Sequence, residues 1–253
     1  MPSKKGERPL KNERPIRYAI YAIFLFLIIS LAFTIHLYSE GLISQTSYLV
    51  YASIAQSMVF SFVVFAYMLA TGRNLRQIIR QLGLSGKSFG SKYLLYGFGI
   101  FLAIFALEII LSIFQAVTGI QLPTNVAQLF NGLPFYFLVF SVVVVPVNEE
   151  ILFRGFLVPK LGAALAASNP NAKRRRNAQR SALWFGIIMS ALIFAALHYL
   201  SYASISELVA ALVFGLIAGY VRMRKDSLYP SIFAHMLINF IGLLALAILA
   251  LIL

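Results

Sequence analysis

Long apolar segments alternate with short polar segments along most of this 253-residue chain. A helix needs roughly 20 apolar residues to cross a hydrocarbon core of about 30 Å. Seven segments meet that length, and there is room for an eighth span or a re-entrant piece. The predicted spans are 18–38, 48–70, 93–117, 135–166, 182–199, 205–221 and 230–253. The pattern therefore predicts an all-α, polytopic membrane protein, a bundle of about seven transmembrane helices.

The composition agrees with a membrane protein and excludes most other classes. Hydrophobic residues make up 60% of the chain and charged residues only 11%, with a mean hydropathy of +0.86. Soluble domains have about a quarter charged residues, so a cytosolic enzyme is a poor fit. The chain has no cysteine, which excludes disulfides, thiolate metal sites and cysteine nucleophiles. The polar residues 1–17 and the long apolar run that follows predict a basic N-terminal tail, not a cleavable signal peptide.

Basic residues are concentrated in the polar segments. The chain has 21 Lys and Arg against 8 Asp and Glu, a net charge of +13. Nineteen of the 21 bases lie in 1–17, 71–92, 168–180 and 222–229, whereas 39–47, 118–134 and 200–204 have none. The positive-inside rule then predicts that the N-terminal tail and the basic segments are cytoplasmic. We expect a single transmembrane domain, residues 18–253, in a prokaryotic plasma membrane. We expect the bases to contact anionic lipid headgroups and not nucleic acid.

Ionisable residues inside a span are costly, so each is a candidate for function. The fourth span contains Glu149, Glu150 and Arg154. Glu150 and Arg154 are four residues apart and share a helical face, where an ion pair offsets their insertion cost. Glu149 lies about 100° round the helix, so Arg154 cannot pair equally with both glutamates. One carboxylate can be held as a structural anion while the other accepts a proton, a division that is typical of acid–base sites. A purely structural pair fits Glu150 equally well, and Glu108 and His36 have no predicted role.

Three further polar side chains lie in the later spans. His198 follows Phe194 by four residues, and His235 and Asn239 are also four apart, so each pair shares a helical face. Taken alone, each of these residues is more typical of a structural residue that makes a hydrogen bond than of a catalytic one. Together with a glutamate, two imidazoles and a carboxamide can activate a water molecule and stabilise an oxyanion. The combination favours hydrolysis.

These residues form three ordered motifs on separate predicted spans. EExxxR is Glu149, Glu150 and Arg154, FxxxH is Phe194 and His198, and HxxxN is His235 and Asn239. In this combination the sequence resembles the CPBP family of intramembrane proteases, which comprises CAAX proteases and bacteriocin-processing enzymes and includes the Ras-converting CAAX endopeptidases. The resemblance covers about residues 93–245, which would form the protease core.

The resemblance implies an endopeptidase that hydrolyses peptide bonds within the membrane. The implied roles are water activation by Glu149 and His198, an oxyanion site of His235 and Asn239, and orientation of the site by Glu150 and Arg154. The implied partner is a peptide or protein substrate at the membrane, with a lipidated C-terminus as one candidate.

The family is also described as metalloproteases, so a zinc ion held by His198, His235 and Glu149 stays an alternative. Two imidazoles and a carboxylate suit zinc with an open position for water. However, the chain lacks the HExxH helix of many zinc proteases, and a water activated by glutamate needs no metal. We favour a mechanism that requires no cofactor.

A catalytic role requires Glu149 and His198 to meet. In straight parallel helices their depths differ by about ten Å, because His198 lies near the outer end of its predicted span. A structure that holds them apart would exclude the catalytic interpretation. Two other functions stay open: a membrane scaffold or bacteriocin self-immunity protein, and a proton-coupled transporter with a carboxylate relay. No inverted repeat is visible to favour the transporter.

Overall fold

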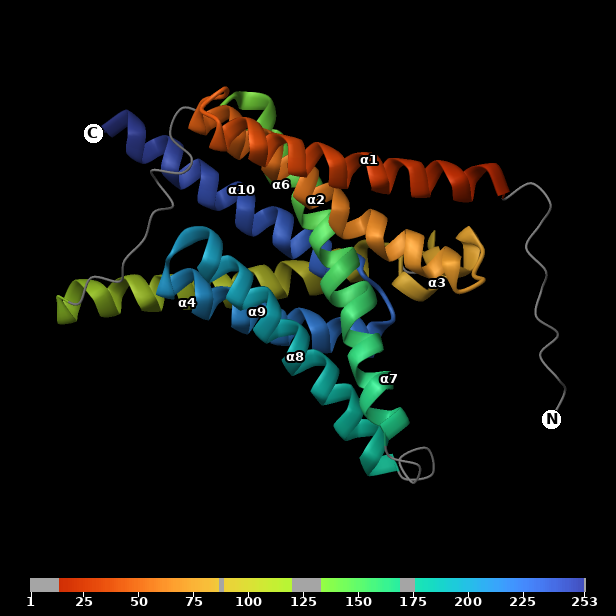
Figure 1. Ribbon diagram of the computed structural model, residues 1–253. Coiled ribbons are helices and arrows are strands. Elements are labelled where there is room, and N and C mark those ends of the chain that lie inside the picture. The colour runs from red at the N-terminus through yellow and green to blue at the C-terminus, as the bar shows by residue number, and fades with distance from the viewer. Residues whose placement is uncertain (1–13, 87–88, 120–132, 169–175, 253) are drawn as a thin grey trace, which may run out of the picture. The chain divides into compact units, whose positions relative to one another are not determined.

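The computed structural model describes residues 14–86, 89–119, 133–168 and 176–252. These residues are mostly helical and contain no strand, which confirms the predicted all-α class (Figure 1). Most of the predicted basic tail lies outside the described residues, as do the central parts of the segments 118–134 and 168–180.

Seven helical stretches among the described residues are long and apolar enough to cross a membrane. They are Tyr21–Ser39, Gln45–Ala70, Ser91–Thr118, Phe135–Ala167, Ala178–Tyr202, Ile205–Lys225 and Tyr229–Ile248. Each overlaps one predicted span, so the chain is an integral, multi-pass membrane protein. The fifth differs most, because helix α8 (Arg176–Tyr202) begins before and ends after the predicted 182–199. Polar residues at both ends continue the helix beyond its apolar part.

The chain forms two compact units, Met1–Gln81 and Leu82–Leu253. In the first unit, α1 (Arg14–Ser39) and α2 (Gln45–Ala70) pack against each other as a hairpin. Gly41 reverses the chain with a φ of 68°, a left-handed conformation that favours glycine. The rings of Tyr38 and Tyr48 stack beside this turn, with centroids 4.4 Å apart. A short helix, α3 (Leu75–Leu82), follows α2.

The second unit contains the remaining helices. They are α4 (Ser91–Thr118), α6 (Phe135–Glu150), the π-helical segment η3 (Ile151–Leu157), α7 (Val158–Ser168), α8, α9 (Ile205–Lys225) and α10 (Tyr229–Ile252). Helix α10 packs against α4 and α6, and α8 packs against α7 and α9. Since α6, η3 and α7 follow without a break, this one helical rod contacts both α10 and α8. The three sequence motifs lie on the rod, α8 and α10.

A glycine brings α7 and α8 into backbone contact. A Cβ atom added at Gly186 of α8 would lie 2.2 Å from the Val158 carbonyl oxygen of α7, a distance that no side chain tolerates. Small residues of this kind allow helices in lipid to approach closely, because van der Waals packing between them is the main attraction there. This contact fixes α8 against the helical rod.

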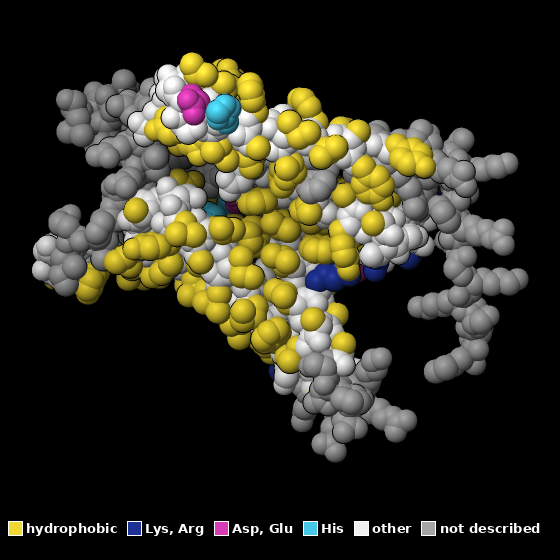
Figure 2. Space-filling view, in the orientation of Figure 1, with side chains coloured by type: hydrophobic (Ala, Val, Ile, Leu, Met, Phe, Trp, Pro, Cys, Tyr) yellow, Lys and Arg dark blue, Asp and Glu magenta, His cyan; other side chains and the backbone are white. Residues whose placement is uncertain are grey.

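The distribution of side chains is that of a membrane protein. Large hydrophobic side chains such as Leu102, Ile110 and Ile113 of α4 are exposed. Figure 2 shows hydrophobic side chains covering the visible faces of α8 and α9. In contrast, the charged Glu150 and Arg154 are buried inside the second unit. Lipid accepts apolar side chains on the outside, whereas charged groups must find partners inside.

Candidate active site

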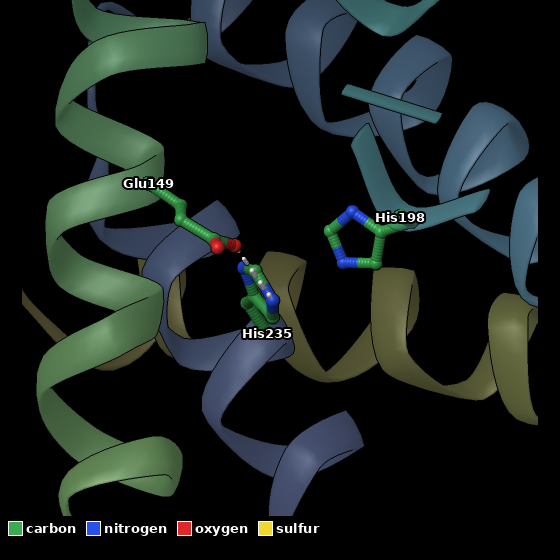
Figure 3. A group of neighbouring side chains, drawn as sticks. All are labelled: Glu149, His198 and His235. Carbon is green, nitrogen blue, oxygen red and sulfur yellow. Dashed lines mark ion pairs between the residues drawn. The ribbon is translucent and has the colours of Figure 1, made fainter. Parts of the chain in front are cut away.

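Three side chains from three helices of the second unit point toward one another (Figure 3). Glu149 comes from the end of α6, His198 from α8 and His235 from α10. One potential metal-ligating atom of each residue lies within 4.8 Å of those of the other two. His235 Nε2 lies 3.6 Å from Glu149 Oε2. One residue from each of the three motifs therefore meets the others at one place.

The difference in depth along the sequence does not hold Glu149 and His198 apart. The expected separation assumed straight, parallel helices. In Figure 1, α6 and α8 are inclined to each other, so equal distances along the two helices are not equal depths. The geometric requirement for a joint role of these two residues is met.

Glu150 lies behind this cluster and links Arg154 to His235. Its Oε1 atom accepts a hydrogen bond from Arg154 Nη1 at 2.8 Å and lies 3.1 Å from His235 Nδ1. The side chains of Glu150 and Arg154 are 0% and 1% exposed. The ion pair that the spacing of four residues predicted is present, and it is fully buried.

The contact with Glu150 determines which nitrogen of His235 carries the proton. A carboxylate paired with an arginine has only acceptor oxygens, so His235 Nδ1 donates to Glu150. In the neutral ring Nε2 then keeps its lone pair, and this is the nitrogen that faces Glu149. A carboxylate that orients an imidazole through its far nitrogen is common behind metal ligands and catalytic histidines.

A helical irregularity follows the two glutamates directly. Residues Ile151–Leu157 form the π-helical segment η3, and Pro146 removes a backbone donor about one turn before the glutamates. The Phe153 carbonyl of η3 accepts a hydrogen bond from Ser190 Oγ of α8 at 3.0 Å. Single π-helical turns are frequent at functional sites. The hydrophobic pattern does not predict this segment, for which Pro146 is the available signal.

His198 and Asn239 are each fixed by a backbone carbonyl. His198 Nδ1 lies 3.1 Å from the Phe194 carbonyl oxygen in α8, so Nδ1 donates and Nε2 is the basic nitrogen. Asn239 Nδ2 donates to the Ser141 carbonyl oxygen of α6 at 2.9 Å. This bond connects α10 to α6. It uses one of the two amide hydrogens of Asn239, so the other can donate to a further group. Ser141 was not singled out in the sequence, since its backbone and not its side chain makes the contact.

Two polar residues without a predicted role lie elsewhere. Glu108 belongs to α4 and is not a member of the cluster of Glu149 and the two histidines. His36 belongs to α1 in the first unit. Neither residue changes the composition of the site.

The donor atoms of the cluster suit either a metal ion or a water molecule. Two imidazole nitrogens and a carboxylate oxygen form a set that zinc accepts, with a position left for water. Glu149 Oε2 is buried and has no hydrogen-bond partner among the described residues. A buried carboxylate oxygen without a partner needs a donor or a cation nearby. The same atoms can hold a water molecule between Glu149 and His198.

One comparison with known proteins finds a similarity over the residues of this site. Residues 131–241 match the family model described as type II CAAX prenyl endopeptidase, Rce1-like. The matched segment contains all three motifs. The match confirms the resemblance that these motifs indicate. No curated protein and no solved structure matches the chain.

Proposed function

We propose that the protein is an intramembrane endopeptidase that cleaves a membrane-associated peptide or protein, since residues 131–241 match an Rce1-like family model. The convergence of Glu149, His198 and His235 carries this proposal. Hydrolysis of an amide in the membrane needs a base, an ordered water molecule and donors for the developing oxyanion. These three helices bring suitable groups to one place, next to the buried ion pair of Glu150 with Arg154.

Glu149 and His198 are the proposed water-activating residues. Both offer acceptors, the Glu149 carboxylate and the basic nitrogen of His198, and a water molecule has two hydrogens to donate. Glu149 takes one proton as the water oxygen attacks the substrate carbonyl carbon. The tetrahedral intermediate then collapses, the C–N bond breaks, and the proton held by Glu149 passes to the leaving amine. Glu149 is thereby returned to its ionised form.

His235 and Asn239 are the proposed oxyanion donors. Asn239 still has one amide hydrogen, because its bond to the Ser141 carbonyl uses only the other. His235 Nε2 donates only when the ring carries protons on both nitrogens. The ion pair of Glu150 with Arg154 positions Glu150 to stabilise such an imidazolium through Nδ1. Donors already placed where charge develops are among the largest contributions to catalysis.

The proposed mechanism needs no metal, although the same residues suit one. Zinc would be held by Glu149, His198 and His235, and it would polarise the substrate carbonyl and acidify a bound water. His235 would then serve in its neutral form, with Nδ1 donating to Glu150. The two protonation states of His235 thus separate the two mechanisms.

The proposed substrate carries its cleavage site near the membrane, and a lipidated C-terminus is the candidate that the family description supports. The basic segments are proposed to contribute to substrate binding at the membrane surface. With 19 of 21 bases on alternate segments, we place the N-terminus in the cytoplasm of a prokaryotic cell. Those bases attract anionic headgroups and acidic substrate segments at the same face.

Cleavage by the full chain in liposomes tests the proposal. The probes are a C-terminally prenylated CAAX peptide and an unmodified transmembrane peptide, each with a fluorophore and quencher across the expected bond. Glu149→Gln should reduce kcat by at least about 10²-fold, because it removes the base but keeps the shape. The matched control is Glu108→Gln, which changes a glutamate of α4 outside the cluster and should cleave like wild type.

Two results would contradict the proposal. Wild-type cleavage that Glu149→Gln leaves unchanged would exclude Glu149 as the base. A wild-type protein that cleaves neither probe, while it binds one of them, would support the scaffold or immunity function instead.

A further inference from the structure

The Arg154 guanidinium contacts two aromatic rings, Phe194 and Phe214, which also contact each other with centroids 6.1 Å apart. Its Cζ atom is 4.0 Å from the centroid of the Phe194 ring and 4.7 Å from that of Phe214. Arg154 is 1% exposed, and its Nη2 atom has no hydrogen-bond partner among the described residues. A buried cation is costly when its charge is only partly compensated. The negative faces of the two rings offset part of that cost.

Phe214 also contacts the imidazole of His235. The two rings meet edge to face, with centroids 5.1 Å apart and planes at 61°. The Phe214 side chain of α9 therefore contacts both Arg154 and His235. Glu150 Oε1 contacts the same two residues. Because Glu150 Oε1 contacts both, a rotation of the guanidinium would move the carboxylate and with it the Nδ1 bond of His235.

Phe194 completes the enclosure from α8. Its ring meets His235 edge to face at 5.9 Å and lies 4.2 Å from the ring of His198, measured between centroids. Phe194 belongs to the FxxxH motif, whereas Phe214 belongs to no motif and comes from a helix that carries none. Phe194 and Phe214 thus hold Arg154 from two helices.

The residue after Phe214 lets α9 approach this closely. A Cβ atom added at Gly215 would lie 2.7 Å from Ala191 Cβ of α8 and 3.4 Å from Arg154 Nη2. Only a residue without a side chain brings α9 near enough for Phe214 to reach the guanidinium. Phe214 itself is buried, at 3% exposure.

We propose that Phe214 is a positioning residue of the active site, which fixes the Arg154–Glu150–His235 chain by stacking on the guanidinium and bracing the imidazole. The expected effect of Phe214 on kcat rests on the proposed endopeptidase function. The expected effect of Phe214 on the hydrogen bond of His235 Nδ1 does not depend on activity. Of the residues proposed to act on water or substrate, the one that Phe214 contacts through its ring is His235, so its effect passes through His235.

Phe214→Leu is the test variant, since leucine keeps an apolar side chain but removes the aromatic face. In the liposome cleavage assay, kcat should fall by roughly tenfold while KM stays within about twofold, because misorientation affects the chemical step. The matched control is Phe101→Leu in α4, at a site of 9% exposure without a stacking contact to Arg154 or His235. It should leave kcat at the wild-type value.

NMR of the histidine rings in the full chain reports the protonation of His235 directly. A purely structural role of Phe214 would leave these signals unchanged. The chain has only three histidines, so ¹⁵N labelling of histidine yields a simple spectrum in which His235→Gln identifies the His235 signals. Wild type and Phe101→Leu should show Nδ1 of His235 protonated and in a strong hydrogen bond. Phe214→Leu should shift those signals toward a ring that exchanges between tautomers.

The outcomes separate this proposal from the proposed function. The positioning role is overturned if Phe214→Leu retains wild-type kcat and an unchanged His235 spectrum, or if Phe101→Leu produces the same losses. If wild type cleaves no probe but Phe214→Leu alone alters the His235 spectrum, the endopeptidase function fails and the positioning role stands.

Discussion

His235 Nδ1 lies 3.1 Å from Glu150 Oε1, the same oxygen that accepts a hydrogen bond from the fully buried Arg154. A single carboxylate oxygen is therefore shared between a structural cation and a histidine of the candidate active site. The opposite nitrogen of that histidine faces Glu149 at 3.6 Å. The two adjacent glutamates thus contact the two nitrogens of one ring. Changes at Glu150 should affect both stability and chemistry.

Glu150→Gln should destabilise the protein by about 3 kcal/mol, because it leaves the buried Arg154 cation without its counter-ion. Activity should also fall, since a neutral amide orients His235 less strongly. The measurements are denaturant unfolding in detergent micelles and the liposome cleavage assay. We expect the free energy of unfolding and kcat to decrease together.

Asp226→Asn is the matched control for that prediction. Asp226 pairs with Arg222 at 2.9 Å with the same spacing of four residues, but its side chain is 86% exposed. Arg222 is buried at 4% exposure, but water at the exposed carboxylate screens this pair, so the loss should be clearly smaller than that of Glu150→Gln. Equal losses for the two variants would show that burial of the Glu150 pair has no energetic consequence.

Asn239→Ala should lower kcat by about 10²- to 10³-fold with little change in KM, if Asn239 is an oxyanion donor. Cleavage kinetics with saturating peptide measure this. Ser141→Ala controls for local packing, because it removes a hydroxyl from α6 but keeps the backbone carbonyl that Asn239 contacts. A loss confined to KM would assign Asn239 to substrate binding instead.

Metal removal should leave the cleavage rate unchanged. In the proposed mechanism Glu149 and His198 activate water without a metal, so incubation with a strong zinc chelator removes nothing that the reaction requires. The check is kcat before and after chelation, with the zinc content of the protein measured in parallel. Activity that disappears on chelation and returns with zinc would assign the ion to Glu149, His198 and His235.

The sequence predicted the helical class and the spans well because both depend on local information. Apolar length alone marks a span, and residues four apart share a helix face whatever the fold around them. The pairing of Glu150 with Arg154 follows from that spacing. The meeting of Glu149 with His198 depends on helix inclination, a tertiary property that a linear pattern does not contain.

Other parts of the site had no sequence signal of this kind. Ser141 contributes through its backbone carbonyl, so its side-chain type carries no information about the contact. Phe214 is one of 22 phenylalanines, and only the position of α9 distinguishes it from those that face lipid. The π-helical segment beginning at Ile151 has Pro146 as its one signal, and a proline inside a span does not specify a change of helical repeat.

Single cysteines should reveal the orientation of the chain, because the sequence contains none of its own. A cysteine at Glu40, in the turn between α1 and α2, should react with a membrane-impermeant thiol reagent in intact cells. A cysteine at Gly86, in a basic segment, should react only after permeabilisation. Both native residues are exposed, so the reagent can reach either site. The reverse pattern would place the N-terminus outside and contradict the predicted orientation.

Gly215→Ala should destabilise the protein by about 1–3 kcal/mol, because the new methyl group would overlap Ala191 Cβ at 2.7 Å and press on Arg154. If α9 moves away to accommodate the methyl group, Phe214 withdraws from the guanidinium and kcat falls as well. The control is Gly99→Ala in α4, where a Cβ atom meets nothing within 4 Å. Alanine is the better helix former, so this control should be neutral or slightly stabilising. Melting temperatures and kcat of the two variants measured side by side decide whether close approach at Gly215 is required.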